Sequence, residues 1–333
     1  MGTMRAVAAF DGLPVDDPAS LVDVELEVPE PRPADLLVEV RAVSVNPVDV
    51  KRRVRGGPSS TPRVLGFDAA GTVVATGERV TGFAVGDEVY YAGDVTRQGS
   101  NAEYQAVDHR IVGHKPSSLS FAEAAALPLT GLTAWESLFD RLGLGHRSDG
   151  TLLVLGAAGG VGSVLVQLAR LRTAVRVIGT ASRPQSAQWA TRLGAHAVVD
   201  HRDLVPRALE AAPDGVEWLF SPFSTGRIEE FARIVKPFGH IVAIDDGAPD
   251  LSPLKPRSIA WHWEFMFTRA AERTPDMAEQ GRILEAIARH VEAGELMTTV
   301  STVLDDFSAA GLRHAHALVE SGRTIGKVVI ARP

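Results

Sequence analysis

The segment Leu152-Leu153-Val154-Leu155-Gly156-Ala157-Ala158-Gly159-Gly160-Val161-Gly162 decides the fold of this chain. Its apolar first half predicts a buried strand, and the residues that follow predict a helix over about 161–171. Small residues allow a sharp turn between the two, Gly159 lets the backbone approach a pyrophosphate, and Gly162 lets the helix pack closely on the strand. Unpaired N–H groups at the start of the helix would then face the phosphate charge.

Strand-like and helical segments alternate behind this turn. Further strands are expected at 175–179, 197–200, 217–220 and 240–244. This alternation predicts the α/β class, with a doubly wound parallel sheet of the Rossmann type. A glycine-rich run alone could be a purely structural turn, but this context favours a dinucleotide site.

Several residues are expected to contact the dinucleotide. The pyrophosphate should meet the backbone of the glycine turn, and the nicotinamide should lie beyond the carboxyl ends of the central strands. The residues expected at these two places are Ala158, Gly159, Gly160, Val161, Ser221 and Ile244.

The end of the second strand indicates which dinucleotide binds. It reads Val177-Ile178-Gly179-Thr180-Ala181-Ser182-Arg183, and no Asp or Glu occurs between Arg176 and Val199. An acidic residue here would accept from the ribose of NAD and repel a 2′-phosphate. Ser182 and Arg183 can donate to that phosphate instead, which favours NADPH.

Three nearby residues have more open roles. Thr180 is expected among the cofactor contacts, at the end of the second strand. His201, after the third strand, could reach the same phosphate or be an ordinary surface histidine. Arg183 also has a second interpretation: it could simply begin a surface helix before Pro184.

The first part of the chain has a different sequence pattern, with short strand-like runs in place of alternating strands and helices. Short alternating runs such as 6–10, 36–43 and 88–91 are separated by Gly, Pro and Asp clusters, which predicts a small barrel-like domain. The expected organisation is a β-barrel domain over 1–124, the dinucleotide domain over 125–268, and a return of 269–333 to the first domain.

Composition excludes several classes of function. The net charge of −7 argues against binding to nucleic acid, and the apolar runs are too short to cross a membrane. No basic, apolar leader precedes the first strand, so a cytoplasmic protein is expected. The chain has no cysteine, which excludes disulfides, thiol nucleophiles and cysteine-ligated zinc or iron–sulfur sites.

Four further segments stand out beside the glycine turn: Ser44-Val45-Asn46-Pro47-Val48-Asp49, Gly86-Asp87-Glu88-Val89, Leu127-Pro128-Leu129-Thr130-Gly131-Leu132-Thr133-Ala134 and Gly326-Lys327-Val328-Val329. Together with the turn, they resemble the quinone oxidoreductase branch of the medium-chain dehydrogenase/reductase superfamily, whose first domain is GroES-like. The segment Trp261-His262-Trp263-Glu264-Phe265-Met266-Phe267-Thr268-Arg269 resembles the subgroup named zinc-type alcohol dehydrogenase-like. The resemblance implies a homodimer.

The residues that would bind zinc in this superfamily are replaced. Asn46 stands at the position of the first ligand, and Gly66-Phe67-Asp68 stands where the family has Gly-His-Glu. A catalytic zinc needs about three protein donors, and Phe67 cannot donate. No metal is therefore expected. Without a metal, conjugated acceptors suit the chemistry better than simple alcohols, because their developing charge delocalises onto a distant oxygen.

The expected reaction is hydride transfer from NADPH to a quinone or a related hydrophobic conjugated carbonyl. Asn46 would donate a hydrogen bond to cofactor or substrate; by resemblance, Thr130 would contact the nicotinamide region and Lys327 the ribose or the polar entrance of the site. Tyr91 could donate the proton, although a packed aromatic is the more ordinary role. Phe67 and Trp263 would form an apolar wall for a flat substrate. By resemblance, Asp49 could support the substrate cleft; alternatively, it could only cap the segment before Lys51.

Two other functions stay open. One is reduction of the double bond of an alkenal or enone, which the sequence does not separate from quinone reduction. The other is a crystallin-like or sensor protein that binds NADPH without turnover. The physiological substrate and the oligomeric state cannot be read from the sequence.

Overall fold

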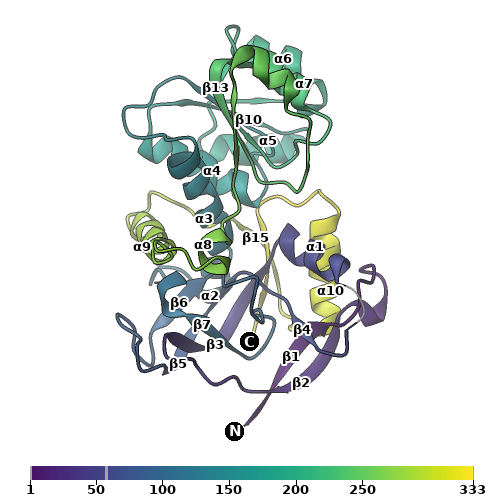
Figure 1. The fold of residues 1–333 in the computed structure, drawn as a ribbon, viewed down its shortest axis with the longest axis vertical. Coiled ribbons are helices and arrows are strands. Elements are labelled where there is room, and N and C mark those ends of the chain that lie inside the picture. Colours follow the sequence, from purple (N-terminus) through teal and green to yellow (C-terminus); the bar gives the residue numbers. More distant parts are fainter. Residues whose placement is uncertain (1, 57–58, 333) are drawn as a thin grey trace. The chain divides into compact units, whose positions relative to one another are not determined.

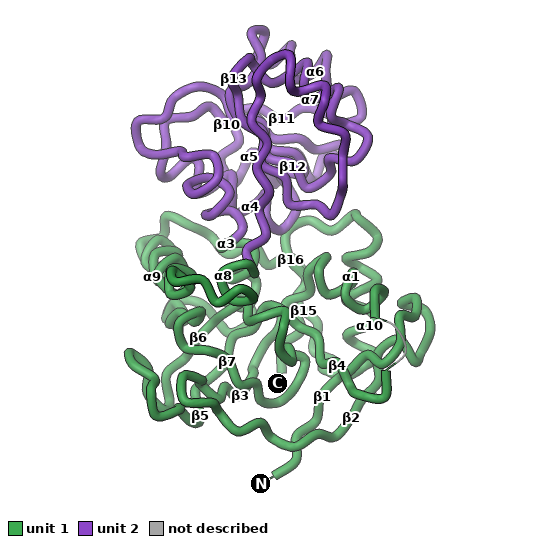
Figure 2. The backbone as a smooth tube through the Cα atoms, viewed as in Figure 1, with its two compact units in different colours: residues 1–132, 267–333 green, residues 133–266 purple. Residues whose placement is uncertain are grey.

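The computed structural model describes residues 2–56 and 59–332. The chain forms two compact units, coloured separately in Figure 2: unit 1 holds residues 1–132 and 267–333, and unit 2 holds residues 133–266. The first boundary follows Leu132, later than the residue 124 given by the sequence. The reason is that α2 (Phe121–Ala125) packs on the strands of unit 1, and Gly131 lies against Ile287.

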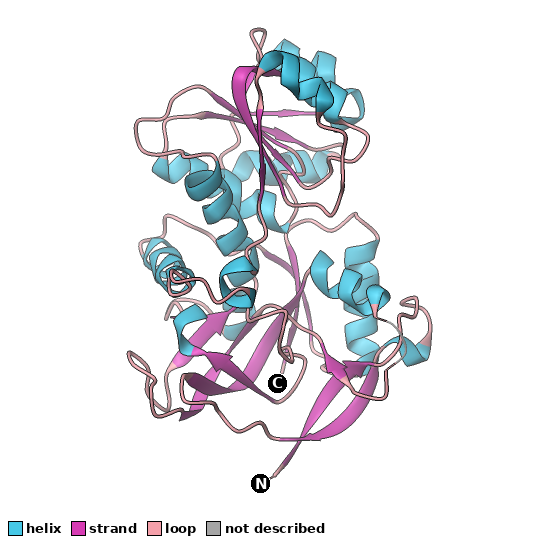
Figure 3. Ribbon diagram, in the orientation of Figure 1, coloured by secondary structure: helices cyan, strands magenta, loops and turns pink. Residues whose placement is uncertain are grey.

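Unit 2 is built on a parallel sheet (Figure 3). Its strands lie in the order β11-β10-β9-β12-β13-β14, and each neighbouring pair is parallel. Strand order reverses between β9 and β12, as in a doubly wound dinucleotide fold. The bounds are β9 (Thr151–Val154), β10 (Arg176–Thr180), β11 (Ala197–Val199), β12 (Val216–Ser221), β13 (Val235–Ala243) and β14 (Ala260–Trp263). The predicted fold class is confirmed.

The helices of unit 2 connect these strands and cover both faces of the sheet (Figure 1). They are α4 (Gly160–Arg172), α5 (Pro184–Arg192), α6 (Leu204–Ala211) and α7 (Ile228–Ile234). On one face, Leu153 and Ile178 pack with Leu204 of α6 and Phe231 of α7 in a buried cluster. On the other face, the indole Nε1 of Trp189 in α5 donates to Ser163 Oγ in α4 over 2.8 Å, which joins those two helices.

Unit 1 is β-rich, as its alternating runs predict. Its main sheet has the order β15-β16-β3-β5-β6-β8, with β7 also paired to β3, and a smaller sheet has the order β2-β1-β4. The strand bounds are β1 (Thr3–Ala9), β2 (Val22–Glu27), β3 (Asp35–Val45), β4 (Arg63–Val64), β5 (Ala69–Thr76), β6 (Glu88–Tyr91), β7 (Tyr104–Asp108), β8 (Val112–His114), β15 (Val300–Leu304) and β16 (Lys327–Ala331).

Helices complete unit 1. They are α1 (Pro47–Arg55), α2, α8 (Thr268–Ala271), α9 (Glu279–Glu292) and α10 (Ala309–Glu320), while α3 (Pro128–Trp135) crosses the unit boundary. Helix α3 stays α-helical to Trp135 and continues as π-helical turns over Glu136–Arg141. In the described part of the chain, no helix has the length and apolar character needed to cross a membrane.

Candidate functional site

The glycine turn after β9 is close-packed, and the packing explains its composition. Gly156 has a φ of +65°, a left-handed conformation that suits glycine. A Cβ on Gly162 would lie 2.3 Å from the carbonyl oxygen of Gly156. Helix α4 can therefore begin directly on the turn only because this residue has no side chain.

The start of α4 offers backbone donors. Gly159 is the N-cap and has no side chain with which to satisfy the first N–H groups of the helix. These groups lack partners within the helix, and the helix dipole adds partial positive charge there. The turn thus fits a pyrophosphate at Ala158, Gly159, Gly160 and Val161, the residues that the sequence predicts.

Thr180 at the end of β10 holds this turn in place. Its hydroxyl oxygen accepts from Gly156 N at 3.0 Å, and its carbonyl oxygen accepts from Ala157 N at 3.2 Å. Gly179 is equally constrained, since a Cβ there would lie 2.7 Å from the Cβ of Ala157. Thr180 therefore supports the conformation of the glycine turn, and its direct contact with a cofactor stays a prediction.

The carboxyl ends of β9, β12 and β13 meet beside the turn. Leu155 N donates to Phe220 O, and Ile244 N donates to Ser221 O, each at 3.0 Å. The Ser221 hydroxyl accepts from Phe223 N at 3.1 Å and from the Ser224 hydroxyl at 3.0 Å. Ser221 and Ile244 are therefore brought together beside the switch point of the sheet, where ligands bind in this class of fold.

The residues predicted to select the cofactor follow β10 and β11. Ser182 and Arg183 are partly exposed and immediately precede α5, whose first residue is Pro184. His201 follows β11, and burial lowers the pKa of its imidazole. A neutral His201 would contribute little charge to a phosphate site, so Arg183 is the stronger cation at this edge of the sheet.

Unit 1 contains a buried polar cluster, here called the Asn46 cluster, made of Asn46, Asp49, Asp68 and Lys327. Each of these four residues is at most 3% exposed to solvent. Strands β16, β3 and β5 are neighbours, and the register pairs Val328 with Val45. Lys327 at the start of β16 therefore lies beside Asn46, which follows β3, and Asp68, which precedes β5.

The amide of Asn46 is engaged on both sides. Its Nδ2 donates to Asp68 Oδ2 at 2.8 Å, and its Oδ1 accepts from Lys327 Nζ. Lys327 Nζ also donates to Val45 O at 3.2 Å and to Asp68 Oδ2 at 3.1 Å. The direct contact of Asn46 with cofactor or substrate stays a prediction, and its observed role is to connect these two charges.

Each of the two carboxylates accepts a backbone N–H hydrogen bond from the start of a helix. Asp68 Oδ1 accepts from Leu129 N, in the first turn of α3, at 2.7 Å. Asp49 accepts from Asn46 N at 2.8 Å and from Gly66 N at 3.0 Å, so it caps α1. Burial raises the pKa of both carboxyls, that of Asp49 to about 7, while the nearby Lys327 charge opposes the rise.

The other predicted residues of unit 1 are buried too. The Thr130 hydroxyl donates back to Ala126 O and Leu127 O, each at 3.2 Å. Tyr91 lies in the main hydrophobic core; its hydroxyl has no partner among the described residues, and burial raises its pKa. These surroundings favour the packed-aromatic alternative over a proton donor.

The two residues predicted as an apolar wall lie in different units. Phe67 in unit 1 is 1% exposed and meets Phe267 edge to face at 5.5 Å, with Arg52 over its ring at 5.6 Å. Trp263 in unit 2 is 47% exposed and packs edge to face on Trp261 at 5.3 Å. Each supplies apolar area in its own unit.

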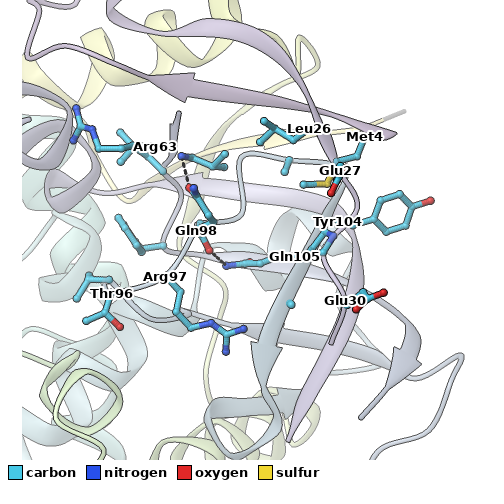
Figure 4. Close-up of a pocket in the computed structure, with 18 of the residues that line it drawn as sticks. Met4, Leu26, Glu27, Glu30, Arg63, Thr96, Arg97, Gln98, Tyr104 and Gln105 are labelled. Carbon is cyan, nitrogen blue, oxygen red and sulfur yellow. Dashed lines mark hydrogen bonds between the residues drawn. The ribbon is translucent and has the colours of Figure 1, made fainter. Parts of the chain in front are cut away.

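A pocket of about 670 Å³ lies in unit 1 (Figure 4). Gln98 organises its wall: its Oε1 accepts from Val64 N at 2.7 Å, and its carbonyl accepts from Gln105 Nε2 at 3.0 Å. Of the residues predicted to act on substrate, Phe67 lines this pocket. The pocket was not predicted from the sequence.

Comparison with known proteins identifies the class. Residues 32–136 match the family model of the alcohol dehydrogenase GroES-like domain, and residues 193–330 match that of zinc-binding dehydrogenases. With the fold described above, these matches show that the chain belongs to the medium-chain dehydrogenase/reductase superfamily, whose members bind a nicotinamide cofactor. It is an oxidoreductase of that superfamily.

Within the superfamily the chain belongs with the zinc-type alcohol dehydrogenase-like proteins. It is 42% identical over 314 residues to such a protein, SAR2277 of Staphylococcus aureus, covering 92% of this chain and 93% of that one. A solved structure from Rhizobium etli CFN 42, assigned to the zinc-dependent alcohol dehydrogenases, is 47% identical with a TM-score of 0.95, covering 99% and 98%. The 2-methylene-furan-3-one reductase of Solanum lycopersicum is 32% identical, covering 93% of this chain and 74% of its own length.

The family names imply zinc, but the residues of this chain do not fit it. Asn46 and Phe67 stand where ligands would be needed, and the Lys327 ammonium lies among the oxygens of Asn46 and Asp68. Among the described residues, no group of three or more His, Cys, Asp or Glu side chains could hold a metal ion. A tetrahedral zinc site with about three protein donors cannot be assembled here.

Proposed function

We propose that this protein is an NADPH-dependent reductase that transfers a hydride to a conjugated carbonyl, either a quinone or an α,β-unsaturated ketone or aldehyde. Bound NADPH would supply the hydride. The observation that carries the proposal is the Asn46 cluster: Asn46 stands at the position of the first zinc ligand, and the ammonium of Lys327 lies against its amide oxygen and against Asp68. Alcohol oxidation would then lack a metal to stabilise the alkoxide, whereas a conjugated acceptor spreads its charge without one.

The choice of NADPH is supported by the end of β10. Ser182 and Arg183 replace the acidic residue that would bind the ribose of NAD. A guanidinium bond to the 2′-phosphate is worth about 1.5–3 kcal/mol, which is roughly ten- to a hundredfold in affinity. The relative that reduces 2-methylene-furan-3-one, named for an enone-type substrate, supports an acceptor of this class.

The test is NADPH oxidation measured with a quinone, with an enone and, in the oxidative direction, with a primary alcohol, each with and without chelator. We expect turnover of at least one conjugated acceptor, unaffected by chelator. Activity confined to the alcohol and abolished by chelator would refute the proposal. Turnover of the enone alone or the quinone alone decides between the two acceptor types, and binding of NADPH without any turnover would favour the sensor-type alternative.

Cofactor choice is tested by Arg183→Glu. We expect NADPH affinity to fall at least about tenfold while NADH affinity changes little. Arg233→Glu on α7, which makes the same charge change at an exposed position of unit 2, is the matched control. Tighter binding of NADH than NADPH by the parent protein would contradict the assignment.

A further inference from the structure

The contacts of Lys327 are those of a bound cation. Its Nζ meets three oxygen atoms: the carbonyl of Val45 at 3.2 Å, Asp68 Oδ2 at 3.1 Å and Asn46 Oδ1. An ammonium has three N–H donors, so these acceptors account for all of them. The side chain is 4% exposed, and that of Asp68 is fully buried.

A buried carboxylate is among the oxygens around Lys327. Asp68 Oδ2 contacts the ammonium directly at 3.1 Å, and both side chains are buried. Removing one partner of a buried pair leaves an uncompensated charge and is strongly destabilising. The positive charge of Lys327 is therefore expected to contribute strongly to the stability of unit 1.

We propose that the Asn46 cluster is an all-oxygen cation site that the chain fills with its own lysine, Lys327, in place of a metal ion. The donor set supports this assignment, because carboxylate, amide and backbone carbonyl oxygens are the ligands of hard cations such as Mg²⁺ and Mn²⁺. A flexible four-carbon stem delivers the ammonium to the point where those oxygens converge. Metal content and stability report on this site independently of turnover.

The unmodified protein gives the first test. Because Lys327 occupies the site, the purified chain should carry no stoichiometric zinc, and neither Zn²⁺ nor Mn²⁺ should raise its Tm. Metal content is measured by elemental analysis and Mn²⁺ binding by the loss of the free-ion EPR signal. A stoichiometric metal in the parent protein that disappears in Asp68→Asn would overturn the proposal.

Lys327→Ala gives the second test, because it removes the internal cation and leaves the oxygens. We expect this variant to bind about one Mn²⁺ per chain, and its Tm to rise when Mn²⁺ is added. Adding Asp68→Asn to it should abolish both effects. Lys236→Ala, which breaks the surface pair of Lys236 with Glu217 in unit 2, is the matched control and should bind no Mn²⁺. If Lys327→Ala folds but neither binds Mn²⁺ nor gains Tm from it, the oxygens around Lys327 are not a cation site and the proposal is wrong.

A third measurement applies if Lys327→Ala does not fold. Lys327→Gln keeps polar contacts without the charge and should raise the unfolding constant at least about a hundredfold. The same change in an Asp68→Asn background should cost about tenfold or less, because no carboxylate is then left unpaired. Equal losses in the two backgrounds would show that Lys327 does not serve as the counter-cation of Asp68.

Discussion

Gly162→Ala tests the dinucleotide site through its packing. The new Cβ would lie 2.3 Å from Gly156 O and 2.8 Å from Ala157 Cα, both backbone atoms, so α4 must move away from the turn. Overpacking of this kind costs about 1–3 kcal/mol. For a unit of this size, that corresponds to a fall in Tm of roughly 4–12 °C.

The same movement displaces the N–H groups that face the pyrophosphate. A loss of about 1.4 kcal/mol of binding free energy is tenfold in affinity, so the Kd for NADPH should rise at least about tenfold. Calorimetric titration gives the Kd, and circular dichroism gives the Tm.

Gly145→Ala is the matched control for this substitution. A Cβ there meets nothing within 4 Å, and its φ needs no glycine, so binding and Tm should both stay unchanged. If Gly162→Ala behaves like this control, the close approach of α4 to the turn does not exist, and the pyrophosphate is bound elsewhere.

Two further predictions concern unit 1. Because burial raises the pKa of Asp49 to about 7, the native state keeps a proton that the unfolded chain has lost; stability should therefore fall as pH rises from about 4 to about 7, by an amount on the order of 4 kcal/mol, and then level off. Urea midpoints across this range should show the slope in the parent and a flatter profile in Asp49→Asn, and parallel profiles would contradict the assignment. Tyr91→Phe removes a buried hydroxyl without a partner among the described residues, so NADPH oxidation should be unchanged and stability the same or up to about 1 kcal/mol higher. A tenfold or larger loss of kcat in Tyr91→Phe would instead restore Tyr91 as the proton donor.

Most of unit 2 could be predicted because its signals are local. A buried strand, a glycine turn and a helix follow each other within residues 151–172, and the constraint on Gly162 involves its near neighbours Gly156 and Ala157. The missed strand β14 has no such signature. It reads Ala260-Trp261-His262-Trp263, is partly exposed, and is defined by its parallel pairing with β13 rather than by its own pattern.

The missed strand β2 did carry a local signal. Its sequence Val22-Asp23-Val24-Glu25-Leu26-Glu27 alternates apolar and acidic residues, and the structure exposes the acidic positions more than the apolar ones. That alternation is the period of a strand with one face in solvent. It pairs with β1, the preceding strand in the chain, so this strand could have been predicted from the sequence.

The Asn46 cluster could not be predicted from local sequence patterns, because its geometry comes from pairing between segments that are distant in the chain. Asn46 and Lys327 are 281 residues apart and meet only because β16 runs antiparallel to β3 in one register. A shift of that register by one residue would turn the Lys327 side chain to the other face of the sheet and leave Asp68 buried without its cation. The resemblance predicted that zinc ligands are missing at Asn46 and Phe67, but a missing ligand does not show what compensates the charge that remains. The pairing of β16 with β3 supplies that compensation, which links the register of the main sheet of unit 1 to the electrostatics of the site.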